Sequence, residues 1–197
     1  MRAFSAVVLF VVALSTPIAA ANANSYREKG QAAKIAGSIL TVTPSRDWNK
    51  LGISPGKKTE TWTLDGEELN DVTFFAGIEP GKPLVREVSK KRKPLPKFTE
   101  GTLLLEIPEL LEGTYRAAKD LATFTISGSQ PDRFLGSDGI RFSFDYVDND
   151  ALPRRGEGRA ALINGLLYMA VFDAPRLNYY DRTLRDFRTL TDSAKLN

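Results

Sequence analysis

The sequence predicts an α+β fold, a largely antiparallel sheet with helices on both faces in an α/β/α sandwich. The first observation is an Asn164-Gly165 pair between two apolar runs. This is the strongest short-range hairpin signal, because a type I′ turn needs positive φ at both positions. The second observation is that both faces of this hairpin are apolar, so both must be covered. The third is a C-terminal helix with one apolar face, which can cover one face of the hairpin.

Short strands dominate the expected N-terminal third. Residues 39–43 alternate apolar residues with threonines, and Pro44 ends this strand. A turn that carries Trp48 follows. Residues 59–64 place a glutamate, a tryptophan and a leucine on one side and three threonines on the other, which predicts a half-exposed strand. Residues 72–78 are more apolar and predict a buried strand.

The middle of the chain predicts a long loop and then a helix. Residues 79–101 contain four prolines and a run of basic residues, which favour a surface loop with one short edge strand over 84–88. The helix begins near Pro108, a residue that suits a first turn. Its apolar residues recur at helical spacing. Glutamates near its start and basic residues near its end match the helix dipole.

The last third predicts four strands and the closing helix. Residues 122–129 and 140–146 alternate apolar and polar side chains. The hairpin follows, and its two-residue turn fixes the register, so that Ile163 faces Leu166 and Arg159 faces Ala170. Aromatic and leucine residues at three- and four-residue steps over 180–190 predict the closing helix.

Residues 1–23 predict a signal peptide. Arg2 precedes a short apolar run, and small residues then allow cleavage near Ala21 or Ala23. The run is too short to span a bilayer as a mature helix, so we expect no transmembrane segment and a periplasmic or secreted protein. Residues 24–36 read as a flexible leader and 37–197 as a single domain.

Composition excludes several chemistries. The chain has no His and no Cys. It therefore lacks the parts for a Ser-His-Asp or Cys-His nucleophile, a Cys/His zinc site or a disulfide framework. The formal net charge of +3 includes Arg2 of the expected signal peptide. The remaining charges nearly balance, which gives no global field to attract nucleic acid or a membrane.

The order of elements resembles the PsbP-like family, which includes the DcrB-like envelope proteins. The early strand that ends at Pro44, Trp48, the late antiparallel meander and the closing helix with Phe187, Leu190 and Ser193 carry the resemblance. It implies an α/β/α sandwich and an envelope-associated binding or assembly module, with no shared catalytic residues. The chain also resembles secreted proteins of alphaproteobacteria that have no assigned activity.

Two motif-like segments fail their templates. Residues 52–59 have the wrong glycine spacing for a phosphate loop and precede a strand. The acidic segment 145–150 lacks the glycine and the distal glutamate of a calcium-binding loop. We therefore expect no cofactor, no metal site and no catalytic residue.

Several residues remain candidates for contacts with a partner or ligand. Two aromatic residues lie in predicted irregular segments, which more often serve sites. Lys90–Lys93 form a local basic patch. Three arginines could recognise a carboxylate or phosphate, although Arg159 could instead pair structurally with Asp145 or Asp173. The candidates are Trp48, Lys90, Lys91, Arg92, Lys93, Arg154, Arg155, Arg159 and Tyr179.

The first functional hypothesis is an exported, non-enzymatic interaction or assembly module of the cell envelope. Its partner would be an envelope protein that contacts residues 86–97 and the Trp48 region. The alternative is a carrier of a small apolar or amphiphilic ligand held between sheet and helix. A carboxylate-dependent hydrolase is the third hypothesis, and it requires two close carboxylates in one cleft.

Overall fold

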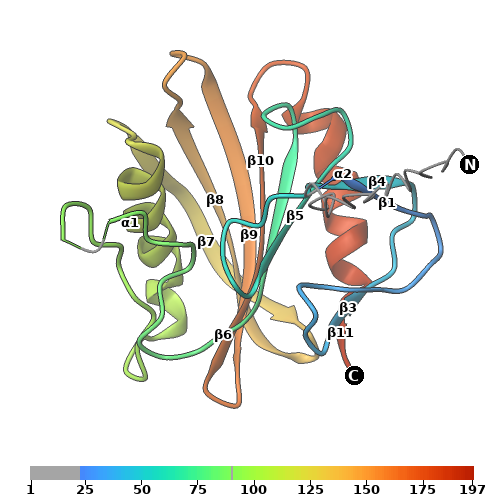
Figure 1. Cartoon of the computed structure of the whole chain (residues 1–197), viewed down its shortest axis with the longest axis horizontal. Helices are drawn as coiled ribbons and strands as arrows, with labels where there is room; N and C mark the ends of the chain where they lie inside the picture. Colours follow the sequence, from blue (N-terminus) through green and yellow to red (C-terminus); the bar gives the residue numbers. More distant parts are fainter. Residues whose placement is uncertain (1–22, 90) are drawn as a thin grey trace, which may run out of the picture.

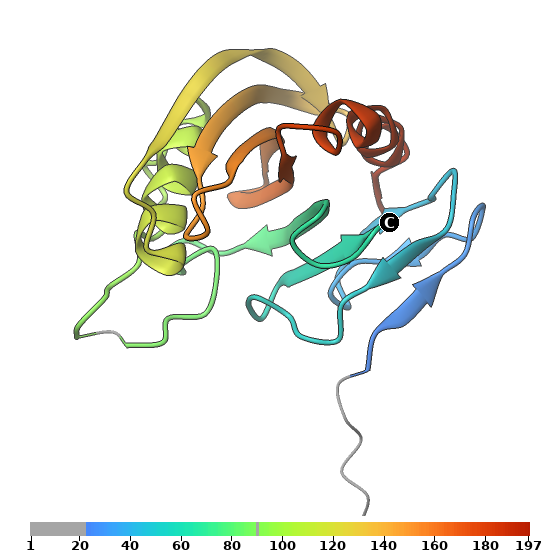
Figure 2. The same cartoon turned by 90° about the horizontal axis from the view of Figure 1, so that it is seen from above.

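The computed structural model describes residues 23–89 and 91–197. The predicted signal peptide lies outside these residues, except for Ala23, and so does Lys90. An eight-stranded, wholly antiparallel sheet dominates (Figures 1 and 2). In spatial order its strands are β1 (Ser25–Arg27), β4 (Trp48–Lys50), β5 (Thr59–Thr63), β6 (Asp71–Ile78), β10 (Leu166–Pro175), β9 (Pro153–Ile163), β8 (Ser137–Val147) and β7 (Phe124–Phe134).

A smaller sheet and two α-helices complete the structure. The small sheet has the order β11 (Lys195–Leu196), β3 (Leu40–Val42) and β2 (Ala33–Lys34). The helices are α1 (Ile107–Lys119), which follows the short 3-10 helix η1 (Leu104–Glu106), and α2 (Tyr180–Asp192). No helix among residues 23–89 and 91–197 is both long and apolar enough to cross a membrane.

The predicted hairpin is confirmed. Asn164 and Gly165 have φ values of 52° and 75°, as a type I′ turn requires. Ile163 pairs with Leu166, and Arg159 pairs with Ala170, so the predicted register holds along the hairpin.

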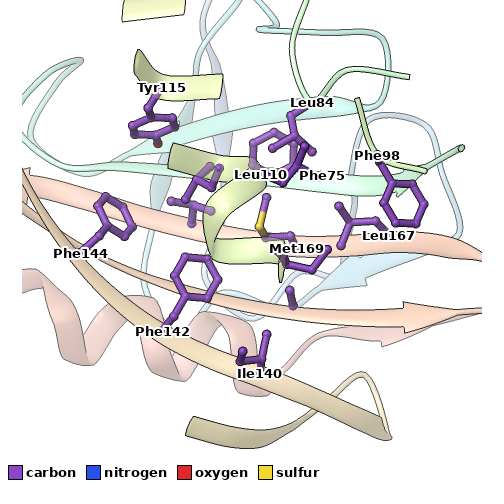
Figure 3. Packing of buried hydrophobic residues seen from close by; sticks show 14 of the residues in the cluster. Phe75, Leu84, Phe98, Leu110, Tyr115, Ile140, Phe142, Phe144, Leu167 and Met169 are labelled. Atoms are coloured by element: carbon purple, nitrogen blue, oxygen red, sulfur yellow. The ribbon is translucent and has the colours of Figure 1, made fainter. Parts of the chain in front are cut away.

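Alternate residues of the central strands enter two separate apolar clusters, as the period of two along a strand requires. Met169 packs in a cluster with Leu110 of α1 (Figure 3), and Leu111 belongs to the same cluster. Ala170 packs in a second cluster with Phe187 of α2. In Figure 1 the strands stand between the two helices.

The predicted sandwich is confirmed only as a mixed fold with a large antiparallel sheet and two helices. The structure does not show a helical layer over each face. Loop residues such as Leu84 and Phe98 share the first cluster with α1. Leu40 and Val42 of the small sheet share the second cluster with α2. The protein therefore contains more β-sheet than the sequence predicts.

Two expectations for the N-terminal third are wrong. Residues 24–36 are not a flexible leader, because β1 pairs with β4, β2 pairs with β3 and Ile35 is fully buried. Strand β5 is not half-exposed, because all five of its residues are buried. Threonine hydroxyls of β5 form hydrogen bonds within the protein, for example the 3.0 Å hydrogen bond between the hydroxyls of Thr61 and Thr73.

Candidate functional site

The segment between β6 and η1 is a closed, anchored loop. Three of its apolar residues, Leu84, Leu95 and Phe98, are buried. The amide of Phe98 donates to the carbonyl of Lys82 (3.0 Å), and the amide of Gly81 donates to the carbonyl of Phe98 (2.7 Å). The edge strand expected over residues 84–88 is absent, because the two arms of the loop pair with each other only at one isolated bridge.

The loop and its neighbour, residues 53–58, carry eight described basic side chains, which we call the basic loop face. The amide of Arg86 donates to the carbonyl of Pro55 (2.8 Å), which joins the two segments. Within the described part of the chain, Lys93 alone of these side chains pairs with a carboxylate, that of Asp120 at 3.0 Å. The basic loop face comprises Lys57, Lys58, Lys82, Arg86, Lys91, Arg92, Lys93 and Lys97.

A cavity of about 440 Å³ lies between these two segments and the end of β6. Its apolar lining includes Ile78, Leu84 and Val85, and Ile78 and Leu84 belong to the buried cluster under α1. Its basic lining consists of Lys57, Lys58, Lys82 and Arg86.

Arg154 forms a buried ion pair, so its guanidinium group is not available to bind a partner at the surface. Its Nη2 and Nε lie 2.7 and 3.0 Å from Oδ1 of Asp173. Tyr146 donates to the same oxygen (2.7 Å), and Tyr115 donates to Oδ2 (3.1 Å). Burial alone would raise the pKa of Asp173, but Lys119 and Arg154 outweigh it and hold this pKa below its ordinary value.

Asp71 is the cross-strand neighbour of Asp173. Its Oδ1 is buried and has no hydrogen-bond partner among the described residues. Burial, together with the negative charge of Asp173, raises the pKa of Asp71 to about 7. The carboxyl lies beside a polar depression of about 490 Å³ whose lining also includes Lys119 and Arg154.

Arg155 and Arg159 lie on the other face of β9 and are also paired. Arg155 binds Asp145 at 2.9 Å. Arg159 binds Asp132 at 2.7 Å and Asp192 at 2.6 Å. The partners expected for Arg159 are therefore wrong. Asp173 points to the opposite face of the sheet, and Asp145 lies opposite Arg155, four residues along the strand.

The two aromatic candidates have different environments. Trp48 is 1% exposed, and its ring lies 6.5 Å from the ring of Trp62. It is a core residue, so the prediction that it contacts a partner at the surface is wrong. Tyr179 is half-buried, and the guanidinium of Arg182 lies 5.0 Å from its ring centre.

The sequence-predicted candidates therefore do not form one site. Lys91, Arg92 and Lys93 are exposed on the loop, while the three arginines are held by carboxylates elsewhere. Sequence reasoning missed Lys57, Lys58, Lys82 and Arg86 as a group, since tertiary contacts alone bring them to one cavity. It also missed Asp71, which no motif marks.

No protein-family model matches the chain, and no curated protein matches it. The solution structure of cyanobacterial PsbP (CyanoP) from Synechocystis sp. PCC 6803 is similar, with a TM-score of 0.54 at 11% identity. The match covers 93% of this chain and 98% of that one. This likeness shows the fold alone, and it confirms the fold-level resemblance to PsbP-like proteins.

Two further solved structures have lower TM-scores. The Ran-binding protein Mog1p of Saccharomyces cerevisiae is 7% identical, with a TM-score of 0.44, and the match covers 88% of this chain and 95% of that one. LpqN of Mycobacterium tuberculosis, described as involved in cell envelope biogenesis, is 12% identical, with a TM-score of 0.33. That match covers 87% of this chain and 89% of that one.

Proposed function

We propose that the protein is an exported, non-enzymatic binding module of the cell envelope that holds an acidic partner protein through its basic loop face. The observation that carries this proposal is the contrast between its cations. Arg154, Arg155 and Arg159 are neutralised by internal carboxylates. The cations of the basic loop face, apart from Lys93, have no ion-pair partner among the described residues.

An acidic surface is the partner that such a face favours. Unpaired cations clustered on one surface create a local positive potential, which speeds association with an acidic patch and disfavours basic ones. The loop is already closed by its own hydrogen bonds and buried anchors, which limits the entropy lost on binding. Val88, which is 99% exposed in this loop, adds an apolar contact.

The proposal of export rests on the pattern of residues 1–23. The first described strand begins at Ser25, and Ser25 pairs with Lys50. Cleavage after Ala21 or Ala23 would therefore leave every described strand intact. The fold shared with CyanoP is consistent with such a module.

The absence of catalysis is also part of the proposal. Asp71 lines the polar depression, and its cross-strand neighbour Asp173 is the buried carboxylate beside it. Asp173 is 3% exposed, and both of its oxygens accept hydrogen bonds from Arg154 or from tyrosines. A carboxylate held in this way is not available to a substrate, which disfavours Asp71 and Asp173 as the carboxylate pair of a hydrolase.

Reversing three charges on the loop tests the proposal. In cross-linking of the full chain within envelope extracts, Lys91→Glu/Arg92→Glu/Lys93→Glu should reduce recovery of the specific partner by about tenfold, because the attraction to its acidic surface is lost. The matched control is Lys34→Glu/Arg176→Glu/Lys195→Glu, which changes exposed cations elsewhere. Quantitative mass spectrometry of the cross-linked proteins is the measurement. Equal recovery of every envelope protein with all three forms would contradict the proposal.

A second candidate, the amphiphile carrier, is favoured by the 440 Å³ cavity. The interface between sheet and helix, where the sequence suggested the ligand, is filled by packed side chains such as Leu110, Phe142 and Met169 (Figure 3). The place for a ligand is instead the cavity beside the basic loop face.

A further inference from the structure

We propose that the cavity between the end of β6 and residues 53–58 and 82–86 binds an amphiphile with a single anionic head group, such as an alkyl phosphate or a fatty acid. The proposal concerns a small-molecule site within the basic loop face. Its cations are not Lys91, Arg92 and Lys93, which the partner test changes and which do not line the cavity.

The apolar part of the cavity suits a hydrocarbon chain. Ile78 and Leu84 are almost fully buried and continue the core under α1, and Val85 packs against the same cluster. A cavity of about 440 Å³ lies within the range of small-molecule sites, which are mostly apolar with a few polar groups that fix orientation.

The polar part of the cavity suits one anion. Lys57, Lys58, Lys82 and Arg86 line it, and Glu79 is the one acidic residue in the lining. None of these four cations forms an ion pair with a described carboxylate. Arg and Lys groups bind carboxylate and phosphate oxygens through charge-assisted hydrogen bonds.

The walls of the cavity are held before any ligand binds. The amide of Arg86 bonds the carbonyl of Pro55, and the amide of Ala76 bonds the carbonyl of Lys58, both at 2.8 Å. Gly56 packs so closely that an added Cβ would lie 3.3 Å from the carbonyl oxygen of Leu84. A preformed site loses little entropy when it binds its ligand.

Both halves of the ligand are needed to use this site. Inorganic phosphate would contact the cations but not the apolar lining of the cavity. A neutral alcohol would contact the apolar lining but not the cations. We therefore expect an alkyl phosphate to bind at least about tenfold more tightly than either, because each half contributes its own interaction.

Calorimetric titration of the full mature chain with decyl phosphate, kept below its micellar concentration, tests the proposal. We expect one site per chain. Lys57→Glu/Lys58→Glu/Arg86→Glu should weaken binding by about tenfold or more through loss of the charge-assisted contacts. Val85→Trp should block the cavity, and urea unfolding verifies that each variant folds. The matched control is Lys34→Glu/Arg176→Glu/Lys195→Glu, which should bind as the unmodified protein does.

Further titrations show which part of the ligand and which cations of the protein are responsible for binding. Decanol and inorganic phosphate should bind far more weakly than decyl phosphate. Lys91→Glu/Arg92→Glu/Lys93→Glu should still bind decyl phosphate, so that loss of partner recovery and loss of amphiphile binding are distinguishable. No binding of decyl phosphate, binding unchanged by both cavity variants, or binding only to phosphatidylglycerol vesicles would overturn the proposal.

Discussion

Arg154→Leu is expected to lower the free energy of unfolding by about 3–5 kcal/mol at pH 7, since removal of one partner of a buried pair leaves an uncompensated charge. The charge is that of Asp173, whose Oδ1 accepts two hydrogen bonds from Arg154. Two tyrosine hydroxyls and Lys119 would remain, but Lys119 Nζ lies 3.7 Å from Oδ2. Urea unfolding at several pH values is the measurement.

The sign of the pH dependence follows from the pKa of Asp173. In the intact protein Lys119 and Arg154 overcome the effect of burial, so this pKa lies below the ordinary value of 3.8. The stability that comes from a lowered carboxyl pKa is present above the ordinary value and is lost as the pH falls through the folded-state value. The deficit of Arg154→Leu should therefore be greatest near neutral pH and disappear only as the pH falls below the ordinary value of 3.8.

Two variants show whether the pair itself is responsible. The double variant Arg154→Leu/Asp173→Asn should recover part of the lost stability, because the unpaired charge is gone. Arg155→Leu, in the next position of the same strand, breaks the more exposed pair with Asp145 and should cost less than about 1 kcal/mol. Equal losses for Arg154→Leu and Arg155→Leu would disprove the buried-pair account.

Asp71→Asn should stabilise the protein at pH 8 by an amount on the order of 2–4 kcal/mol. Burial and the charge of Asp173 raise the pKa of Asp71 from 3.8 to about 7, so the folded protein holds this proton more tightly than the unfolded chain does. The associated stability is complete below about pH 4 and is lost as the pH rises to about 7. The uncharged amide that Asp71→Asn introduces would remove that loss.

Chemical denaturation between pH 4 and pH 8 measures this effect. The unmodified protein and Asp71→Asn should have similar stability at pH 4 and diverge as the pH rises. Asp138→Asn, at a side chain that is 96% exposed, is the matched control and should change little. A stability difference that is the same at both pH values would rule out an elevated pKa at Asp71.

The hairpin and the two helices were predictable because their signals are local. Asn164-Gly165 sets its own turn, and the apolar spacing of residues 107–118 appears within one segment. Strands β1, β2 and β4 were not predicted, because each has two or three residues and depends on a distant partner, as β1 depends on β4. Trp48 was misplaced for the same reason, since the ring that covers it belongs to Trp62.

The sequence alone contained enough information to exclude Asp173 as the partner of Arg159. The predicted register already put Arg159 beside Ala170, and Asp173 is an odd number of residues from Ala170. Alternation along a strand therefore places Asp173 on the opposite face. One of the two true partners, Asp132, comes from β7 and is shared with Arg141, so its identification required the neighbouring strands.

The cavity could not be predicted from the sequence. Residues 52–59 appeared as a failed phosphate loop, and residues 79–101 appeared as an irregular basic segment. One backbone hydrogen bond between Arg86 and Pro55 brings them together. Backbone contacts of this kind leave no periodicity in the sequence, because they do not depend on which side chains flank them.

Photo-cross-linking in cells that export the protein tests most directly whether the basic loop face is the binding surface. A photoreactive residue replaces Val88 in the loop or Leu177 in the turn before α2, two apolar side chains that are 99% and 78% exposed. We predict a covalent adduct with an acidic envelope protein from position 88, lost when Lys91, Arg92 and Lys93 are changed to glutamate. Adducts from position 177 alone, or none from position 88, would contradict the account.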